Sequence, residues 1–136
     1  MKEEIISFEA AKLAKKTGFS EACKNWYNFS GLLIKEASTA QYPSNDKRFP
    51  SYSAPTQSLL QRWLREKHDL FVSISSWFGR DLEYKYNIEE ICIIGDWKRD
   101  LKNNYDNESY ITYEQALEAG LLEALNIIIK DESNSN

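Results

Sequence analysis

Residues 51–68, SYSAPTQSLLQRWLREKH, combine helix-start signals with a regular apolar stripe, and they constrain the fold more than any other segment. Pro55 suits the first turn of a helix, where its missing N–H has no partner to lose. Ser53 or Thr56 can accept hydrogen bonds from the free amides of that turn. Four apolar side chains then share one helix face: Leu59, Leu60, Trp63 and Leu64. The segment therefore predicts an amphipathic helix packed on a sheet.

Two further helices are expected, one near each end of the chain. Ser7 is the expected cap of the first, and Gly18 its stop. Thr112 caps the last, with Gln115 placed as in a capping box. Within this last helix Gly120 weakens the helix by about 1 kcal/mol relative to alanine, unless it serves a close approach of another element.

The strands follow from alternating or continuous apolar runs. We expect them over residues 22–28, 32–36, 70–75, 82–86 and 91–94. Residues 37–52 and 100–109 are polar and read as loops. The order α-β-β-α-β-β-β-α predicts a two-layer α+β fold, with a mainly antiparallel sheet and about three helices on one face.

Size and charge narrow the classes of protein further. The 136 residues fit one domain, expected over residues 1–131, with a disordered polar tail over 132–136. A net charge of −4 argues against binding nucleic acid by bulk charge alone.

The start of the chain lacks a signal peptide and no segment is long enough to span a membrane, so we expect a cytoplasmic protein without a membrane partner. Cys23 and Cys92 are expected to be buried free thiols.

Three segments together resemble a known family. They are EIISFEAAKLAKKTGF, SAPTQSLLQRWLREKH and TYEQALEAGLLEAL, and the likeness runs from residue 4 to about residue 129, weakest over 76–110. The chain resembles a family of small uncharacterised proteins encoded by gut bacteria and by their phages and prophages. The resemblance implies an accessory role tied to mobile genetic elements, and it carries over no site residue.

No catalytic or metal-binding arrangement is present in the sequence. The single histidine, His68, follows a helix and suits the negative end of its dipole better than general-base catalysis. No glycine elbow surrounds a serine, and the glycines are not clustered as in a phosphate-binding loop. The acidic residues Asp96, Asp100, Asp106 and Glu108 lack the glycine and final glutamate of a calcium loop. We therefore predict no catalytic residue, cofactor or metal.

Two kinds of interaction remain open. On the last helix Leu122, Leu125 and Ile129 form a second apolar stripe, which either packs internally or contacts a partner helix or a second copy. From this stripe and from the missing catalytic arrangement we predict a non-enzymatic protein-interaction module, and the resemblance described above implies a phage or prophage origin for it.

The alternative is a nucleic-acid-binding accessory protein. Its aromatic side chains would stack on bases and its basic side chains would contact phosphates. The aromatic candidates are Trp26, Tyr84, Tyr86 and Trp97, and the basic ones are Arg62, Arg65, Lys98 and Arg99. Acidic residues interleave with them, and the ribonucleoprotein sheet motif is missing.

Overall fold

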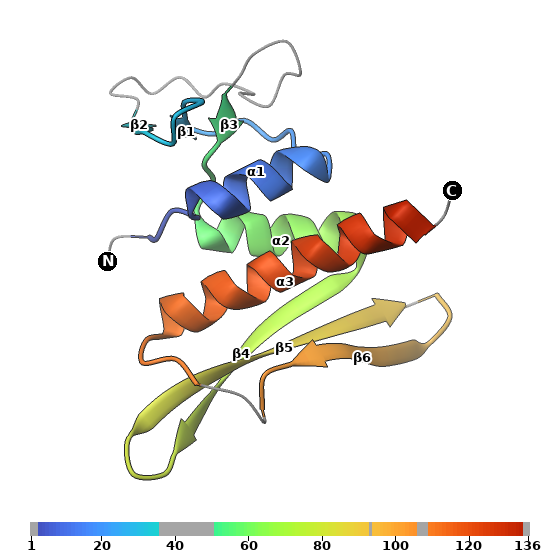
Figure 1. The fold of residues 1–136 in the computed structure, drawn as a ribbon. Coiled ribbons are helices and arrows are strands. Elements are labelled where there is room, and N and C mark those ends of the chain that lie inside the picture. Colours follow the sequence, from blue (N-terminus) through green and yellow to red (C-terminus); the bar gives the residue numbers. More distant parts are fainter. Residues whose placement is uncertain (1–2, 36–50, 93, 106–108, 135–136) are drawn as a thin grey trace. The chain divides into compact units, whose positions relative to one another are not determined.

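The structure, a computed structural model, describes residues 3–35, 51–92, 94–105 and 109–134 (Figure 1). Three helices and two three-stranded antiparallel sheets occupy these residues, which confirms the α+β class and, apart from one additional short strand, the predicted order of helices and strands. The chain divides into two compact units, one of Met1–Leu59 with Leu125–Asn136 and the other of Leu60–Ala124. The prediction of one domain over residues 1–131 stays a prediction.

Helix α1, Phe8–Lys16, belongs to the first unit and begins and ends where the sequence indicates. The Ser7 hydroxyl accepts a hydrogen bond from the Ala10 amide at 3.1 Å, which satisfies one free donor of the first turn. Gly18 adopts a φ of +99°, which turns the chain so that the Phe19 amide donates back to the Ala14 carbonyl at 3.0 Å. Phe19 is fully buried, so this turn anchors the first unit.

The sheet of the first unit has the order β2-β1-β3. Strands β1, Asn25–Tyr27, and β2, Leu33–Lys35, lie within the ranges expected at 22–28 and 32–36 and pair as an antiparallel hairpin. Its turn is held by the Asn28 side-chain oxygen, which accepts from the Ser30 and Leu32 amides. Strand β3, Tyr52–Ser53, pairs with the other side of β1 and was not predicted, because two residues are too few to show a period. Residues 36–50, which include most of the expected loop, lie outside the described residues.

Helix α2, Gln57–His68, has its predicted apolar face buried at Leu60, Trp63 and Leu64. Thr56 is its cap, since its hydroxyl accepts from the Leu59 amide at 3.2 Å. The prediction that Pro55 lies in the first turn was wrong. Pro55 precedes the cap, and its carbonyl accepts from the Ile6 amide at 3.1 Å.

The sheet of the second unit has the order β4-β5-β6. Strand β4, Leu70–Phe78, pairs with β5, Leu82–Cys92, in an unbroken antiparallel register from Leu70↔Glu90 to Phe78↔Leu82. The two strands predicted over 82–86 and 91–94 are thus one strand as far as Cys92, since backbone pairing continues through the polar residues between them. Strand β6, Trp97–Asn103, was expected in part as a loop, because its alternation is almost entirely polar.

Helix α3, Tyr113–Asn134, begins at the predicted cap, where the Thr112 hydroxyl accepts from the Gln115 amide at 3.1 Å. It runs to Asn134 and so includes residues 132–134 of the expected tail. In the second unit its first half covers one face of the β4-β5-β6 sheet (Figure 1). A Cβ atom at Gly120 would lie 2.8 Å from Cγ1 of Val72, which bears out the close approach considered for this glycine.

We expect Gly120→Ala to destabilise the protein. The added methyl group would lie 2.8 Å from Val72 Cγ1 and 3.1 Å from Tyr86 Cβ. Overpacking of this kind costs about 1–3 kcal/mol. Alanine in place of glycine gains about 1 kcal/mol in helix propensity, so the cost exceeds the gain over most of that range. Urea unfolding followed by circular dichroism should show a net loss of about 1 kcal/mol. Gly79→Ala, whose added atom meets nothing within 4 Å, is the control; equal stability of the two variants would contradict the close approach.

Candidate functional site

The backbone groups of β4 point alternately toward β5 and toward the outside of the sheet. The Ile91 amide donates to the Asp69 carbonyl at 3.1 Å, so Asp69 and Ile91 form a hydrogen-bonded pair. In the unbroken register, every second residue from Asp69 onward then bonds β5. The residues between them present their N–H and C=O groups at the outer edge: Leu70, Val72, Ile74, Ser76 and Phe78.

Part of this outer edge is covered and part is free. The Gln61 side chain of α2 donates to the Val72 carbonyl at 2.6 Å and thereby occupies the edge at that residue. Beyond it, no other group within the described residues bonds the outward N–H and C=O of Ile74, Ser76 or Phe78. We call residues 74–78 the free edge of β4. A strand edge of this kind is a template for pairing with another chain.

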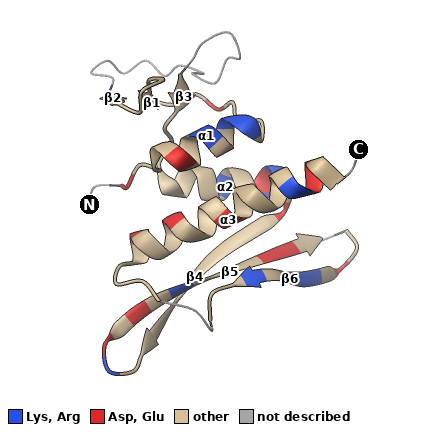
Figure 2. Ribbon diagram, in the orientation of Figure 1, with Lys and Arg blue, Asp and Glu red and all other residues tan. Residues whose placement is uncertain are grey.

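The free edge has none of the usual protection of an edge strand. Charged residues, prolines and bulges normally prevent edge pairing. Strand β4 carries no ionisable side chain over its whole length, as Figure 2 shows, and its register with β5 has no bulge. The end of the β4-β5 hairpin extends beyond α3 (Figure 1).

Large apolar side chains are exposed at this end of the hairpin. Phe78 is 83% exposed, and Leu82, its cross-strand neighbour, is 48% exposed. Trp77, on the opposite face of the sheet, is 46% exposed. Exposed apolar groups beside an unpaired backbone edge are typical of a protein-interaction surface.

On the face of the sheet away from α3, several side chains contact Trp77. The Lys85 ammonium lies 5.3 Å from the Trp77 ring centroid and donates to the Tyr105 carbonyl at 2.6 Å. The Tyr105 ring lies 5.5 Å from that of Trp77, and the Trp77 indole N–H donates to the Ser75 hydroxyl at 2.9 Å. These contacts fix the Trp77 side chain at the end of the free edge. Sequence reasoning missed it, because the strand was expected to end at Ser75.

Strand β6, the opposite edge of the same sheet, is highly charged. Lys98 and Arg99, proposed as phosphate contacts, lie on it and pair with Glu89 and Glu90 of β5 at 2.7 Å each. The hydrogen bond to Glu89 raises the pKa of Lys98. Lys102 pairs with Glu123 of α3 at 2.7 Å. Each of these three basic side chains therefore has a carboxylate partner.

The other proposed nucleic-acid contacts are scattered. Arg62 and Arg65 lie on α2, where Arg62 approaches Glu66 at 3.9 Å and Arg65 is partly exposed.

The aromatic candidates are equally dispersed. Trp97 is 46% exposed on β6, whereas Trp26 belongs to the sheet of the first unit. Tyr86 is buried against Gly120, and its pKa is raised by that burial. Tyr84 stacks edge-on with Tyr113 of α3, at 6.2 Å between centroids. No single stacking surface is formed by these rings among the described residues.

The apolar stripe predicted on α3 is partly internal. Leu125 is fully buried, so it has no surface to offer a partner. Leu122 and Ile129 are partly buried.

The single histidine and the acidic side chains take the following places among the residues that the structure describes. The His68 ring packs edge-on against Trp63, at 4.8 Å between centroids, which matches a structural role. No group of three or more histidine, cysteine or acidic side chains lies close enough to hold a metal ion within the described ranges. Asp106 and Glu108 of the acidic loop lie outside these ranges.

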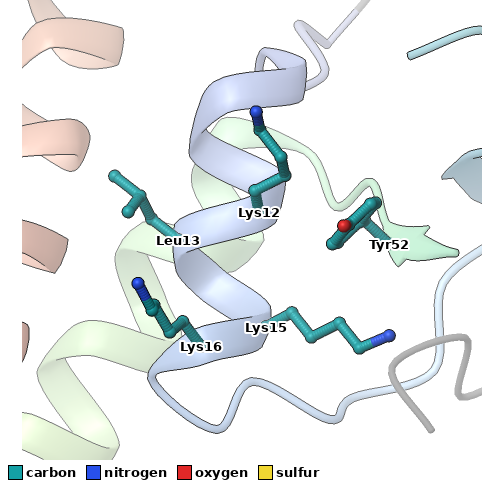
Figure 3. A pocket seen from close by; sticks show the side chains of 5 residues that line it. All are labelled: Lys12, Leu13, Lys15, Lys16 and Tyr52. Atoms are coloured by element: carbon teal, nitrogen blue, oxygen red, sulfur yellow. The ribbon is translucent and has the colours of Figure 1, made fainter. Parts of the chain in front are cut away.

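A hollow of about 450 Å³ lies beside α1 and is lined by Lys12, Leu13, Lys15, Lys16 and Tyr52 (Figure 3). The three ammonium groups do not converge on it: Lys15 extends toward Tyr52, whereas Lys12 and Lys16 point away in other directions. Lys15 donates to the Ser51 carbonyl at 2.8 Å, and Lys12 lies 4.7 Å from the Phe8 ring centroid. A bound anion would need convergent donors, so this hollow is the weaker candidate.

Comparisons with known proteins do not add to this geometry. No family model, no curated protein and no solved structure matches the chain. None of the helices in the described part of the chain is long and apolar enough to cross a membrane.

Both cysteines are free thiols, and only Cys23 is buried. Burial raises the pKa of the Cys23 thiol from 9.0 to about 11; the nearby Glu21 charge adds to the rise, and a hydrogen bond with Ser53 opposes it. Cys92 is half-buried, and its sulfur accepts from the Gly95 amide at 3.3 Å. The prediction of two buried thiols therefore holds for Cys23 alone.

The raised pKa of Cys23 predicts a loss of stability at high pH. Between pH 9.0 and about 11 the unfolded thiol loses its proton while the folded thiol keeps it. The unfolded state then binds fewer protons, so the free energy of unfolding falls as the pH rises through this window. Urea unfolding of wild type and Cys23→Ala should show the wild type losing more stability over the window. Parallel pH profiles would contradict the shift, because the two proteins differ only in the side chain at residue 23.

Proposed function

We propose that this chain is a non-enzymatic protein-interaction module that binds an extended, uncharged strand of a protein partner along the free edge of β4. The observation that carries the proposal is the row of outward N–H and C=O groups at Ile74, Ser76 and Phe78. Strand addition of this kind uses main-chain hydrogen bonds for affinity and alternate side chains for specificity. The resemblance to phage and prophage proteins favours an accessory role in the cytoplasm.

The chemistry of the surface favours a strand over nucleic acid. Lys98 and Arg99 already pair with Glu89 and Glu90, which reduces the positive charge that a phosphate backbone would meet. The free edge, in contrast, offers uncharged backbone donors and acceptors along the strand from Ile74 to Phe78, next to the exposed rings of Trp77 and Phe78. An incoming strand with β-branched or aromatic residues would satisfy these backbone groups and cover the exposed apolar side chains.

A pair of substitutions at Ser76 tests the proposal. Ser76→Pro removes an outward N–H, and proline is tolerated at an edge position whose N–H faces away from the sheet. Ser76→Ala shortens the same side chain and keeps the N–H. The probe is a synthetic peptide that alternates valine and threonine, with one lysine at each end for solubility. We expect the peptide to bind wild type and Ser76→Ala with equal affinity. Its affinity for Ser76→Pro should be lower by roughly tenfold or more, because at least one hydrogen bond is lost and the proline ring obstructs the neighbouring ones.

Hydrogen exchange measured by NMR locates the bound peptide. At a protein concentration where the chain is monomeric, the peptide should slow exchange of the Ile74, Ser76 and Phe78 amides. Protection confined to β6, or no protection anywhere at saturating peptide, would contradict the proposal. Circular dichroism of Ser76→Pro separates a blocked edge from an unfolded protein.

A further inference from the structure

We infer that the partner strand is β4 of a second copy of this chain, so that two β4-β5-β6 sheets join into one sheet across a two-fold axis at Ser76. This inference rests on the proposed function of the free edge. It follows from where the free backbone groups lie, from which side chains would meet, and from the absence of charge on β4.

The position of the axis follows from the free backbone groups. In a two-fold antiparallel pair, the free residues of one strand must lie opposite the free residues of the other. Ile74, Ser76 and Phe78 are symmetric about Ser76, so Ser76 faces itself and Ile74 faces Phe78 of the other copy. Each facing pair exchanges two hydrogen bonds, giving roughly six in total. Gln61 on the Val72 carbonyl limits how far the pairing extends.

The side chains in this register complement one another. On the face that α3 covers, Ile74 meets Phe78 of the other copy, which covers a side chain that is 83% exposed in the single chain. On the opposite face, Ser75 meets Trp77, in a pair whose Cα atoms are about 4.5 Å apart. A small residue opposite a large one leaves space for the indole ring. The two serines at the axis are small enough to face each other without a clash.

The lack of charge on β4 is what makes pairing with its own copy favourable. A two-fold axis places the central residue of each strand opposite itself and brings its neighbours close to their own copies, so a charged residue at or beside the axis lies near a like charge. The residues of β4 present none. Strand β6 fails the same requirement, because a similar pairing about Asp100 would place Asp100 opposite itself and Lys98 opposite Lys102.

Light scattering coupled to size exclusion gives the first test. Over a concentration range from micromolar to millimolar, the wild type should shift from 15.9 kDa toward twice that mass. Ser76→Pro should raise the dimer dissociation constant roughly tenfold or more, whereas Ser76→Ala should leave it unchanged within about a factor of three. A dimer that persists unchanged in folded Ser76→Pro would overturn the inference.

Disulfide trapping tests the register itself. In a Cys92→Ser background, Ser76→Cys places a thiol opposite its own copy at a Cα separation of about 5.5 Å, which a disulfide can span. Ser73→Cys, also exposed and on the same strand, faces Gly79 of the other copy and has no matching thiol. We expect mild oxidation to cross-link Ser76→Cys and to leave Ser73→Cys largely monomeric. Cross-linking of Ser73→Cys in preference to Ser76→Cys would refute the register.

The outcomes separate this inference from the proposed function. A chain that stays monomeric at millimolar concentration, with no Ser76→Cys cross-link, refutes pairing with a second copy. If the valine-threonine peptide still protects the Ile74 and Phe78 amides in that case, the free edge remains a docking site for another protein. If the peptide fails as well, both are wrong.

Discussion

The antiparallel register between β4 and β5 determines which backbone groups of the second unit lie at an open edge and which side chains face α3. Because the pairing runs without a bulge from Leu70 to Phe78, the inward and outward backbone groups alternate strictly along β4. The same register directs Val72 and Tyr86 toward Gly120 of α3, where the absence of a Cβ lets helix and sheet approach closely. One face of the sheet is thereby covered, and the backbone groups at residues 74–78 are left at an open edge.

Much of this fold could be predicted from local chemistry. The caps at Ser7, Thr56 and Thr112, and the stop at Gly18, are short-range signals, since each depends on a hydrogen bond or dihedral angle within four residues. Strand β6 could not be predicted in the same way. Its pairing with β5 is favoured by backbone hydrogen bonds and by cross-strand ion pairs such as Arg99 with Glu90, and neither shows as apolar periodicity.

The free edge could be predicted only in part. The uncharged run from Leu70 to Phe78 is visible in the sequence, and it would have extended the expected strand past Ser75 to Trp77 and Phe78. Whether such a strand lies at an edge or in the centre of a sheet depends on strand order, which no local pattern determines. The interface prediction illustrates how little a local pattern decides: Leu125, which was expected to form an interface, is buried, whereas Phe78, which was not, is exposed.

The charges on β6 have a consequence for how far association can proceed. Joining two copies through β4 uses the uncharged edge of each, and both outer margins of the joined sheet are then β6 strands. The charged residues Lys98, Asp100 and Lys102 lie on these outer strands, and charges on an edge strand disfavour pairing with a further strand. The segment LFVSISSWF has the uncharged, β-prone composition of fibril-forming peptides, yet in this topology growth ends at a closed pair rather than running on into a fibre.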